Sequence, residues 1–142
     1  MTEAGIHITR VFEAPRERVW QEWTEPEAFA DWFGTAELEV PLETVSMDVR
    51  PGGAWRLTML AAGEIHWRGE YREVVEPERL VFTVTDQPDE QYALVTVVLN
   101  DLGDGRTEMQ FSQTGLLPPE MYERTKEGWG KFFDRVDERL RG

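Results

Sequence analysis

Residues 118–140 read PPEMYERTKEGWGKFFDRVDERL, and this stretch decides the fold. A mostly apolar set recurs in it at steps of three and four, the spacing that puts side chains on one stripe of an α-helix. The set is Met121, Thr125, Trp129, Phe132, Phe133, Val136 and Leu140. The two opening prolines suit the first turn of a helix, where a missing N–H costs little. A lone helix with this much apolar surface is not stable in water, so the rest of the chain has to cover it.

Two glycines, Gly128 and Gly130, flank Trp129 in the middle of this predicted helix. Each costs about 1 kcal/mol relative to alanine at such a position. Two interpretations are open. The helix approaches the sheet closely here, which we favour, or the missing side chains leave room for a ligand. The surrounding GWGK sequence lacks the glycine spacing and the following serine or threonine of a phosphate-binding loop.

Seven segments before the helix alternate apolar and polar residues, as half-buried strands do. Their ranges are 6–13, 42–50, 54–60, 65–75, 80–85, 91–100 and 107–113. Short turns separate the last six, and one of them contains Asp104–Gly105, a pair typical of β-hairpins. We therefore expect these six strands to form an antiparallel meander.

Two short amphipathic helices are predicted between the first and second strands. The first begins at Pro15, and Thr24 is expected to cap the second. Their apolar residues are Val19, Trp20, Trp23, Phe29, Trp32 and Phe33. The predicted fold is thus α+β: a strand, two short helices, a six-stranded antiparallel meander and a long C-terminal helix packed across the curved sheet.

A curved sheet that holds one helix leaves a space between them, which the short helices close. Large side chains that border this space are the candidate ligand-binding residues: Trp32, Phe33, Trp55, Met59, Trp67, Tyr71, Phe111, Trp129 and Phe133. Tyr71 is the best polar candidate among them, and Gln113 is expected at the mouth. The polar residues Arg56, His66, Arg68 and Glu70 would join only if a bulge shifted the strand phase. Otherwise we expect them to form exposed cross-strand charge pairs.

Composition excludes several classes of function. The 142 residues carry a net charge of -13, which argues against binding to nucleic acid or to anionic membranes. The chain contains no cysteine, so disulfides, thiolate metal sites and cysteine nucleophiles are excluded. No apolar run approaches the length of a membrane span, and no signal peptide is recognisable. We expect one cytoplasmic domain over residues 1–142.

Motifs for catalysis or metal binding are weak. His7 and His66 lie on separate predicted strands, and no histidine–carboxylate spacing suggests a metal site. The sequence NDLGDG at residues 100–105 resembles part of a calcium loop, but a hairpin turn is the better interpretation. No G-x-S-x-G motif is present. We therefore predict no catalytic residue, no metal and no cofactor.

Four motifs, taken together, resemble a known family. They are RVFEAPRERVWQEWTEPEAFADWFG at residues 10–34, DVRPGGAWRL at 48–57, GEYREVVEPERLVFT at 69–83 and EGWGKFFDRVDERL at 127–140. In this order they are similar to the activators of the ninety-kilodalton heat-shock protein's ATPase and, more broadly, to the START-like (SRPBCC) helix-grip superfamily. The resemblance covers nearly the whole chain. It implies a helix-grip fold whose cavity, between the sheet and the last helix, often holds an apolar ligand.

Three functions remain open at this point. The leading hypothesis is a non-enzymatic domain that binds a hydrophobic or aromatic small molecule in the sheet–helix cavity. The resemblance suggests a second, a chaperone cofactor that stimulates the ATPase of a heat-shock chaperone. The third is a cyclase-like or hydrolase-like enzyme acting on a hydrophobic substrate, which a buried polar group with a perturbed pKa would favour. The sequence predicts no oligomeric state.

Overall fold

The computed structural model describes residues 5–33, 39–61, 63–85, 92–115 and 119–141. The elements within these ranges, with η for 3₁₀ turns, are β1 (Ile6–Phe12), α1 (Arg16–Thr24), α2 (Pro26–Phe33), η1 (Leu42–Thr44), β2 (Ser46–Met47), β3 (Ala54–Ala61), β4 (Gly63–Val75), β5 (Arg79–Val84), β6 (Ala93–Asp101), β7 (Thr107–Thr114), η2 (Pro119–Met121) and α3 (Tyr122–Arg141). This order confirms the predicted α+β class.

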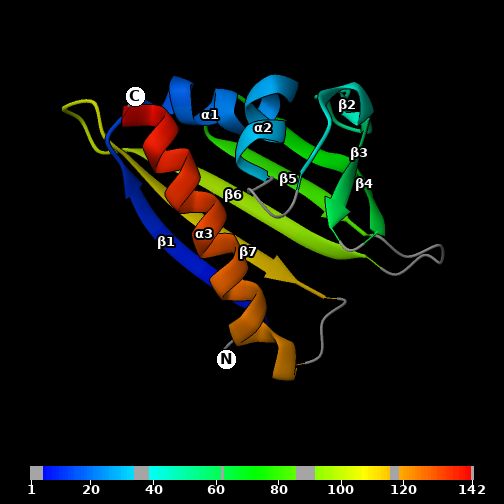
Figure 1. The fold of residues 1–142 in the computed structure, drawn as a ribbon. Helices are drawn as coiled ribbons and strands as arrows, with labels where there is room; N and C mark the ends of the chain where they lie inside the picture. The colour runs from blue at the N-terminus through cyan, green and yellow to red at the C-terminus, as the bar shows by residue number, and fades with distance from the viewer. Residues whose placement is uncertain (1–4, 34–38, 62, 86–91, 116–118, 142) are drawn as a thin grey trace.

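All described strands belong to one antiparallel sheet with the order β1-β7-β6-β5-β4-β3-β2. The six-stranded meander is confirmed as β2 to β7, and β1 joins it at β7 as the seventh strand (Figure 1). Asp104 and Gly105, both at positive φ (48° and 79°), form the turn between β6 and β7. This is the geometry that the Asp–Gly pair predicts.

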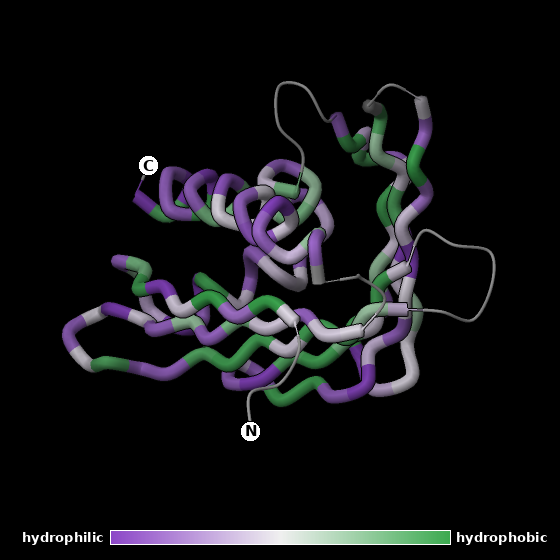
Figure 2. Tube along the Cα trace, turned by 90° about the horizontal axis from the view of Figure 1, so that it is seen from below, coloured by the Kyte–Doolittle hydropathy of each residue, from purple (hydrophilic) through white to green (hydrophobic). Residues whose placement is uncertain are grey.

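The sheet is strongly curved, and its concave face holds the helices. Figure 2 shows the hairpin of β3 and β4 standing upright beside the helices, while the other long strands lie beneath them. In Figure 1, α3 runs diagonally across the sheet, and α1 and α2 lie at one end of it. This arrangement is the helix-grip fold that the sequence predicts.

The apolar stripe of α3 is buried as expected. Trp129, Phe133, Val136 and Leu140 face the core, each 8% exposed or less. The helix extends to Arg141, and its first predicted turn is the 3₁₀ turn η2 rather than α-helix. Pro118, the predicted first residue, lies outside the described residues.

The predicted strand over residues 42–50 is wrong for most of its length. Residues 42–44 form η1, and only Ser46–Met47 pairs with β3. Thr44 explains the difference, because its hydroxyl donates to the Pro41 carbonyl (2.7 Å) and accepts from the Thr58 backbone N–H (3.1 Å). The Thr44 hydroxyl thus takes the place of a backbone partner from a neighbouring strand. Threonine side chains can compete with regular secondary structure in this way.

Thr24 does not cap the second helix. Its hydroxyl donates to the Trp20 carbonyl one turn back in α1 (2.9 Å). The backbone N–H of Phe29 instead bonds the Glu25 carbonyl (2.9 Å), so α2 starts one residue later than expected. The two short helices themselves are confirmed.

Candidate functional site

Eight of the nine predicted ligand-binding residues are buried on the concave side, and Trp67 is partly exposed. Trp32 and Phe133 are fully buried at 0% exposure. Trp55 and Met59 point inward from β3, as their alternation with Arg56 and Thr58 predicts. The strand phases around the candidate site are therefore confirmed.

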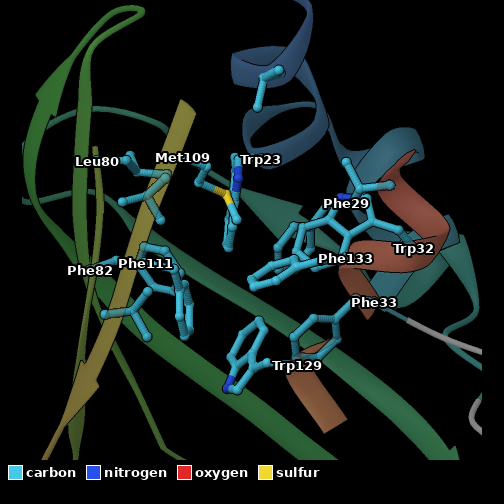
Figure 3. Close-up of a cluster of buried hydrophobic side chains, with 14 of the residues drawn as sticks. Trp23, Phe29, Trp32, Phe33, Leu80, Phe82, Met109, Phe111, Trp129 and Phe133 are labelled. Atoms are coloured by element: carbon cyan, nitrogen blue, oxygen red, sulfur yellow. The ribbon is translucent and has the colours of Figure 1, made fainter. Parts of the chain in front are cut away.

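Five of these residues pack against one another. Phe111 on β7 contacts Trp129 and Phe133 on α3, with ring centroids 4.6 and 5.2 Å apart. Phe33 on α2 contacts Trp129 at 5.9 Å, and Trp32 contacts Phe133 at 6.2 Å. Figure 3 shows these rings converging from two helices and the sheet.

Trp23 of α1 lies at the centre of this cluster and was not among the predicted site residues. Its ring lies within 6.3 Å of six other aromatic rings, namely those of Phe29, Trp32, Phe82, Phe111, Trp129 and Phe133. The sequence showed Trp23 as part of an apolar patch on a short helix. It did not show that this patch points into the sheet rather than covering its end.

Trp55 joins the cluster through Phe29 and Phe82 and makes an unusual contact with β5. Its indole N–H donates to the backbone carbonyl of Thr83 (2.9 Å). Gly69 lies directly opposite Trp55, and a Cβ at Gly69 would overlap the Thr83 carbonyl oxygen and come within 2.5 Å of Trp55 Nε1. The indole reaches β5 only because residue 69 has no side chain.

Tyr71 is 2% exposed, and its ring lies 6.1 Å from that of Phe82. Burial, with a smaller contribution from the negative charge of Asp48, raises the pKa of the Tyr71 phenol well above its usual value. Tyr71 is therefore a neutral hydroxyl at physiological pH. It suits hydrogen bonding better than proton transfer.

Trp67 stands apart from the other rings. It pairs with Leu57 across β3 and β4, and Leu57 is 2% exposed, so Trp67 also faces the concave side. Within the described part of the chain its indole N–H is buried without a hydrogen-bond partner. Such a donor costs about 1–3 kcal/mol, and native proteins rarely retain one.

Gln113, predicted at the mouth, is buried at 8% exposure. Its side-chain oxygen accepts a hydrogen bond from the indole N–H of Trp129 (2.7 Å). Gln113 therefore fixes the orientation of Trp129 instead of facing solvent.

The favoured explanation of the glycine pair in α3 is wrong. A Cβ added at Gly128 or Gly130 would have no described atom within 4 Å, apart from its chain neighbours and the nearby backbone of α3. The helix therefore does not approach the sheet closely at these two positions. Both positions border open space. The carbonyl of Gly130 accepts a hydrogen bond from Arg10 of β1 (3.3 Å).

A charged network that local sequence did not predict fixes the C-terminal half of α3. Arg139 binds the buried carboxylate of Glu22 on α1 through two nitrogens (2.6 and 3.3 Å) and also bonds Asp31 on α2. Arg135 bonds the carboxylate of Asp31 as well (3.0 Å). Burial alone would raise the pKa of the Asp31 carboxyl. The hydrogen bonds from Arg139 and Arg135 outweigh this effect and hold the pKa below its usual value.

The polar residues of β3 and β4 are exposed, as expected, but within the described residues His66 and Glu70 do not form the expected cross-strand charge pairs. His66 faces Thr58, Glu70 faces Ala54, and Arg56 faces Arg68. The carboxylate partners lie on the same strand instead: Glu64 approaches His66 (3.4 Å), and Glu70 approaches Arg72 (3.2 Å). The alternation of apolar and polar residues correctly predicted the face of the sheet on which these side chains lie. Which residues lie opposite one another depends on the register of β3 and β4.

The remaining surface features are limited. A hollow of about 420 Å³ lies between the α1–α2 junction and η1, lined by Glu25, Pro26, Glu27, Leu42 and Val45. Among the described residues no cluster of three or more histidine, aspartate or glutamate side chains has a geometry for a metal ion. No described helix combines the length and apolar character needed to cross a bilayer.

A profile of the family described as activator of Hsp90 ATPase homolog 1-like protein matches residues 13–141. The chain belongs to this family. The match begins directly after β1 and runs to the end of α3, so it includes both the aromatic cluster and the charged network. The comparison with curated proteins finds no match.

Solved structures share the fold of this chain. A Chromobacterium violaceum protein is 27% identical with a TM-score of 0.82, and the alignment covers 96% of each chain. A Silicibacter pomeroyi protein of the same family name is 22% identical with a TM-score of 0.82, covering 96% of this chain and 97% of that one. An Hsp90 activator from Plasmodium falciparum is 19% identical with a TM-score of 0.75, covering 96% and 95%.

Proposed function

We propose that this domain binds a small hydrophobic or aromatic molecule that carries a hydrogen-bond acceptor. The ligand lies on the concave face near β3 and β4, bordered by Trp32, Phe33, Trp55, Met59, Trp67, Tyr71, Phe111, Trp129 and Phe133. The unpartnered indole N–H of Trp67 is the observation that carries this proposal. A carbonyl or hydroxyl oxygen on the ligand would satisfy that donor.

Several other apolar side chains are only partly covered, some on the same face of the sheet as Trp67 and some on α3. Ile65 lies on the same strand face as Trp67, and Met47 lies on β2. Tyr122 and Phe132 of α3 are also partly buried. Covering such surface contributes about 25 cal/mol per Å² of apolar area, so a ligand gains affinity from it without many polar contacts.

Trp67→Phe tests the proposed role of the indole N–H, because it keeps an aromatic ring and removes the donor. The ligand is first found by native mass spectrometry of freshly purified protein, as extra mass that is lost on denaturation. We expect Trp67→Phe to bind it about tenfold more weakly, the loss that corresponds to one hydrogen bond. Stability should stay constant or rise, because no protein partner is lost.

Trp129→Phe is the matched control, because it removes an indole N–H that has a protein partner. We expect it to lower the free energy of unfolding by about 1 kcal/mol, because Gln113 then lacks its donor. Unchanged ligand affinity in Trp67→Phe would show that the indole N–H does not contact the ligand. If no molecule copurifies and apolar fluorescent probes do not bind, the small-molecule proposal is wrong.

A second candidate is a chaperone cofactor, which the family match favours. The Plasmodium falciparum relative of similar fold is an Hsp90 activator. The partly covered side chains of Ile65 and Trp67 on β4 would then contact the chaperone instead of a small molecule. Adding the purified chain to an Hsp90-type chaperone and measuring its ATPase rate separates the two proposals. No stimulation at saturating protein would exclude this role.

A further inference from the structure

The convex face of the sheet, opposite the helices, is not covered by any described helix. Figure 2 shows the helices on one side of the sheet only. On β6, the side chains of Leu94, Thr96 and Val98 alternate with those of Val95 and Val97, which are buried on the concave side. The first three side chains therefore point to the convex face, where they are only partly covered.

Two neighbouring rows of residues on this face, running across β1, β7 and β6, form what we call the convex patch. They are Thr9, Gln110 and Val98 in one row and His7, Ser112 and Thr96 in the other. None of the six is aspartate, glutamate, lysine or arginine, although these four types make up 30% of the chain. The next row, Thr114 and Leu94, lacks them as well. A scarcity of charged residues is what distinguishes the core of a protein–protein interface from ordinary surface.

Charged residues border the convex patch on two sides and already have partners. On β5, Arg79 continues the first row and binds Glu73 of β4 (3.2 Å). In the row beyond Gln110, the carboxylate of Glu108 accepts hydrogen bonds from Asn100 (3.3 Å) and Gln110 (3.2 Å). The face thus has a centre without charge and a charged border, which is the arrangement of an interface core and its rim.

We propose that the convex patch is the contact surface of a homodimer, in which the convex faces of two copies of this chain pack on each other. Each copy carries a net charge of -13, so two copies repel, and they approach at the least electrostatic cost through a surface without charge. The hydroxyls and the amide of the patch are donors as well as acceptors, so two identical patches related by a two-fold axis can satisfy each other. The dimer leaves both concave faces free and is independent of the ligand proposed for them.

The geometry of the sheet limits how strong this dimer is. Side chains on one face repeat about every 7 Å along a strand, and neighbouring strands lie about 4.8 Å apart. Three rows across three strands therefore cover roughly 300 Å² on each copy. Each partner contributes about 800 Å² in a standard stable interface, so we expect a weak dimer that forms only at high protein concentration.

Val98→Lys, compared with Leu42→Lys, tests the interface. Both variants replace an aliphatic side chain by lysine and add one positive charge to the chain. Leu42 is 47% exposed and lines the hollow beside the α1–α2 junction, away from the convex face. The association of each full chain is measured by sedimentation equilibrium between about 10 µM and 1 mM, because dimerisation follows mass action. Amide NMR shifts over the same concentrations identify the residues in contact.

We expect the wild type to dimerise reversibly, with concentration-dependent shifts in the convex patch. Val98→Lys should weaken the dimer by about tenfold or more, because it brings two like charges together, whereas Leu42→Lys should change it by less than about twofold. Added sodium chloride should strengthen the wild-type dimer, because it screens the repulsion between two acidic copies. If Val98→Lys lowers the melting temperature, Thr96→Lys in the second row provides the same test.

Three results would overturn the proposal. A wild type that remains monomeric at about 1 mM in high salt would show that the patch does not bind a second copy. Equal effects of Val98→Lys and Leu42→Lys would show that association responds to overall charge rather than to this face. Concentration-dependent shifts confined to residues outside the convex patch would place the dimer contact elsewhere.

Discussion

Gly69→Ala is expected to destabilise the protein by about 3 kcal/mol or more. The added methyl group would overlap the Thr83 carbonyl oxygen, which belongs to the backbone of β5 and cannot rotate away. It would also displace the indole of Trp55 and break the 2.9 Å hydrogen bond from Nε1 to that carbonyl. The cost therefore combines overpacking with a buried acceptor that loses its donor.

The same substitution at Gly128 and at Gly130 is the matched control. Both lie within α3, and a Cβ there meets open space. Alanine should stabilise each position by about 1 kcal/mol, the difference in helix propensity. Urea unfolding of the three variants measures the contrast. A Gly69→Ala variant within about 1 kcal/mol of wild type would show that Trp55 and β5 adjust easily, contrary to the tight contact described above.

Arg139→Met is expected to lower the free energy of unfolding by about 2–4 kcal/mol at neutral pH. It leaves the carboxylate of Glu22, whose side chain is only 9% exposed, without its cation. It also removes one of the two arginines that bind Asp31. The arginine side chain is 31% exposed, and this reduces the cost below that of a fully buried pair.

Arg141→Met is the control for this change, because its ion pair with Asp137 is more exposed and lies within one helix. Its loss should cost about 0.5 kcal/mol or less. Urea unfolding under identical conditions compares the two variants. Similar small losses in both would mean that the Glu22–Arg139 contact contributes no more than a surface pair.

Because of Asp31, the free energy of unfolding should depend on pH in the acid range. Its pKa is lower in the folded chain than in the unfolded chain, so the unfolded state binds more protons as pH falls. The stabilisation is therefore complete above the unfolded pKa, about 4, and is lost as pH falls through the lowered pKa. Asp31→Asn should be less stable than wild type at neutral pH, and the difference should shrink below about pH 4. A difference that stays constant down to pH 2, well below the ordinary carboxyl pKa, would contradict this assignment.

Hydrophobic periodicity was sufficient to predict the parts of the fold in which each side chain points either to the core or to water. The stripe of α3 and the alternation of Trp55 and Met59 with Arg56 and Thr58 are examples. It failed where a side chain competes with the backbone, as the hydroxyls of Thr24 and Thr44 do. Hydrophobic periodicity does not include such hydrogen bonds, because it records only which side chains are apolar and which are polar.

The candidate site was less accessible to sequence reasoning, because its contacts join distant segments. Trp23 looked like a covering residue until the curvature of the sheet placed it among six other rings. The role of Glu22 could not be recognised from local sequence, since its partner Arg139 lies 117 residues away. The pairing of Arg56 with Arg68 depends on strand register, which alternation alone does not determine.

The separation of Trp67 from the other indoles has an optical consequence. Trp23 lies with its ring centroid 4.9 Å from Trp32 and 6.3 Å from Trp129, so these three chromophores should couple and give a strong near-ultraviolet circular dichroism signal. Trp67 has no ring contact with another described residue and should contribute little to that signal. Its partly exposed indole should instead emit at longer wavelength. The chain therefore carries two intrinsic reporters, one for the packing of the helices on the sheet and one for the β3–β4 hairpin.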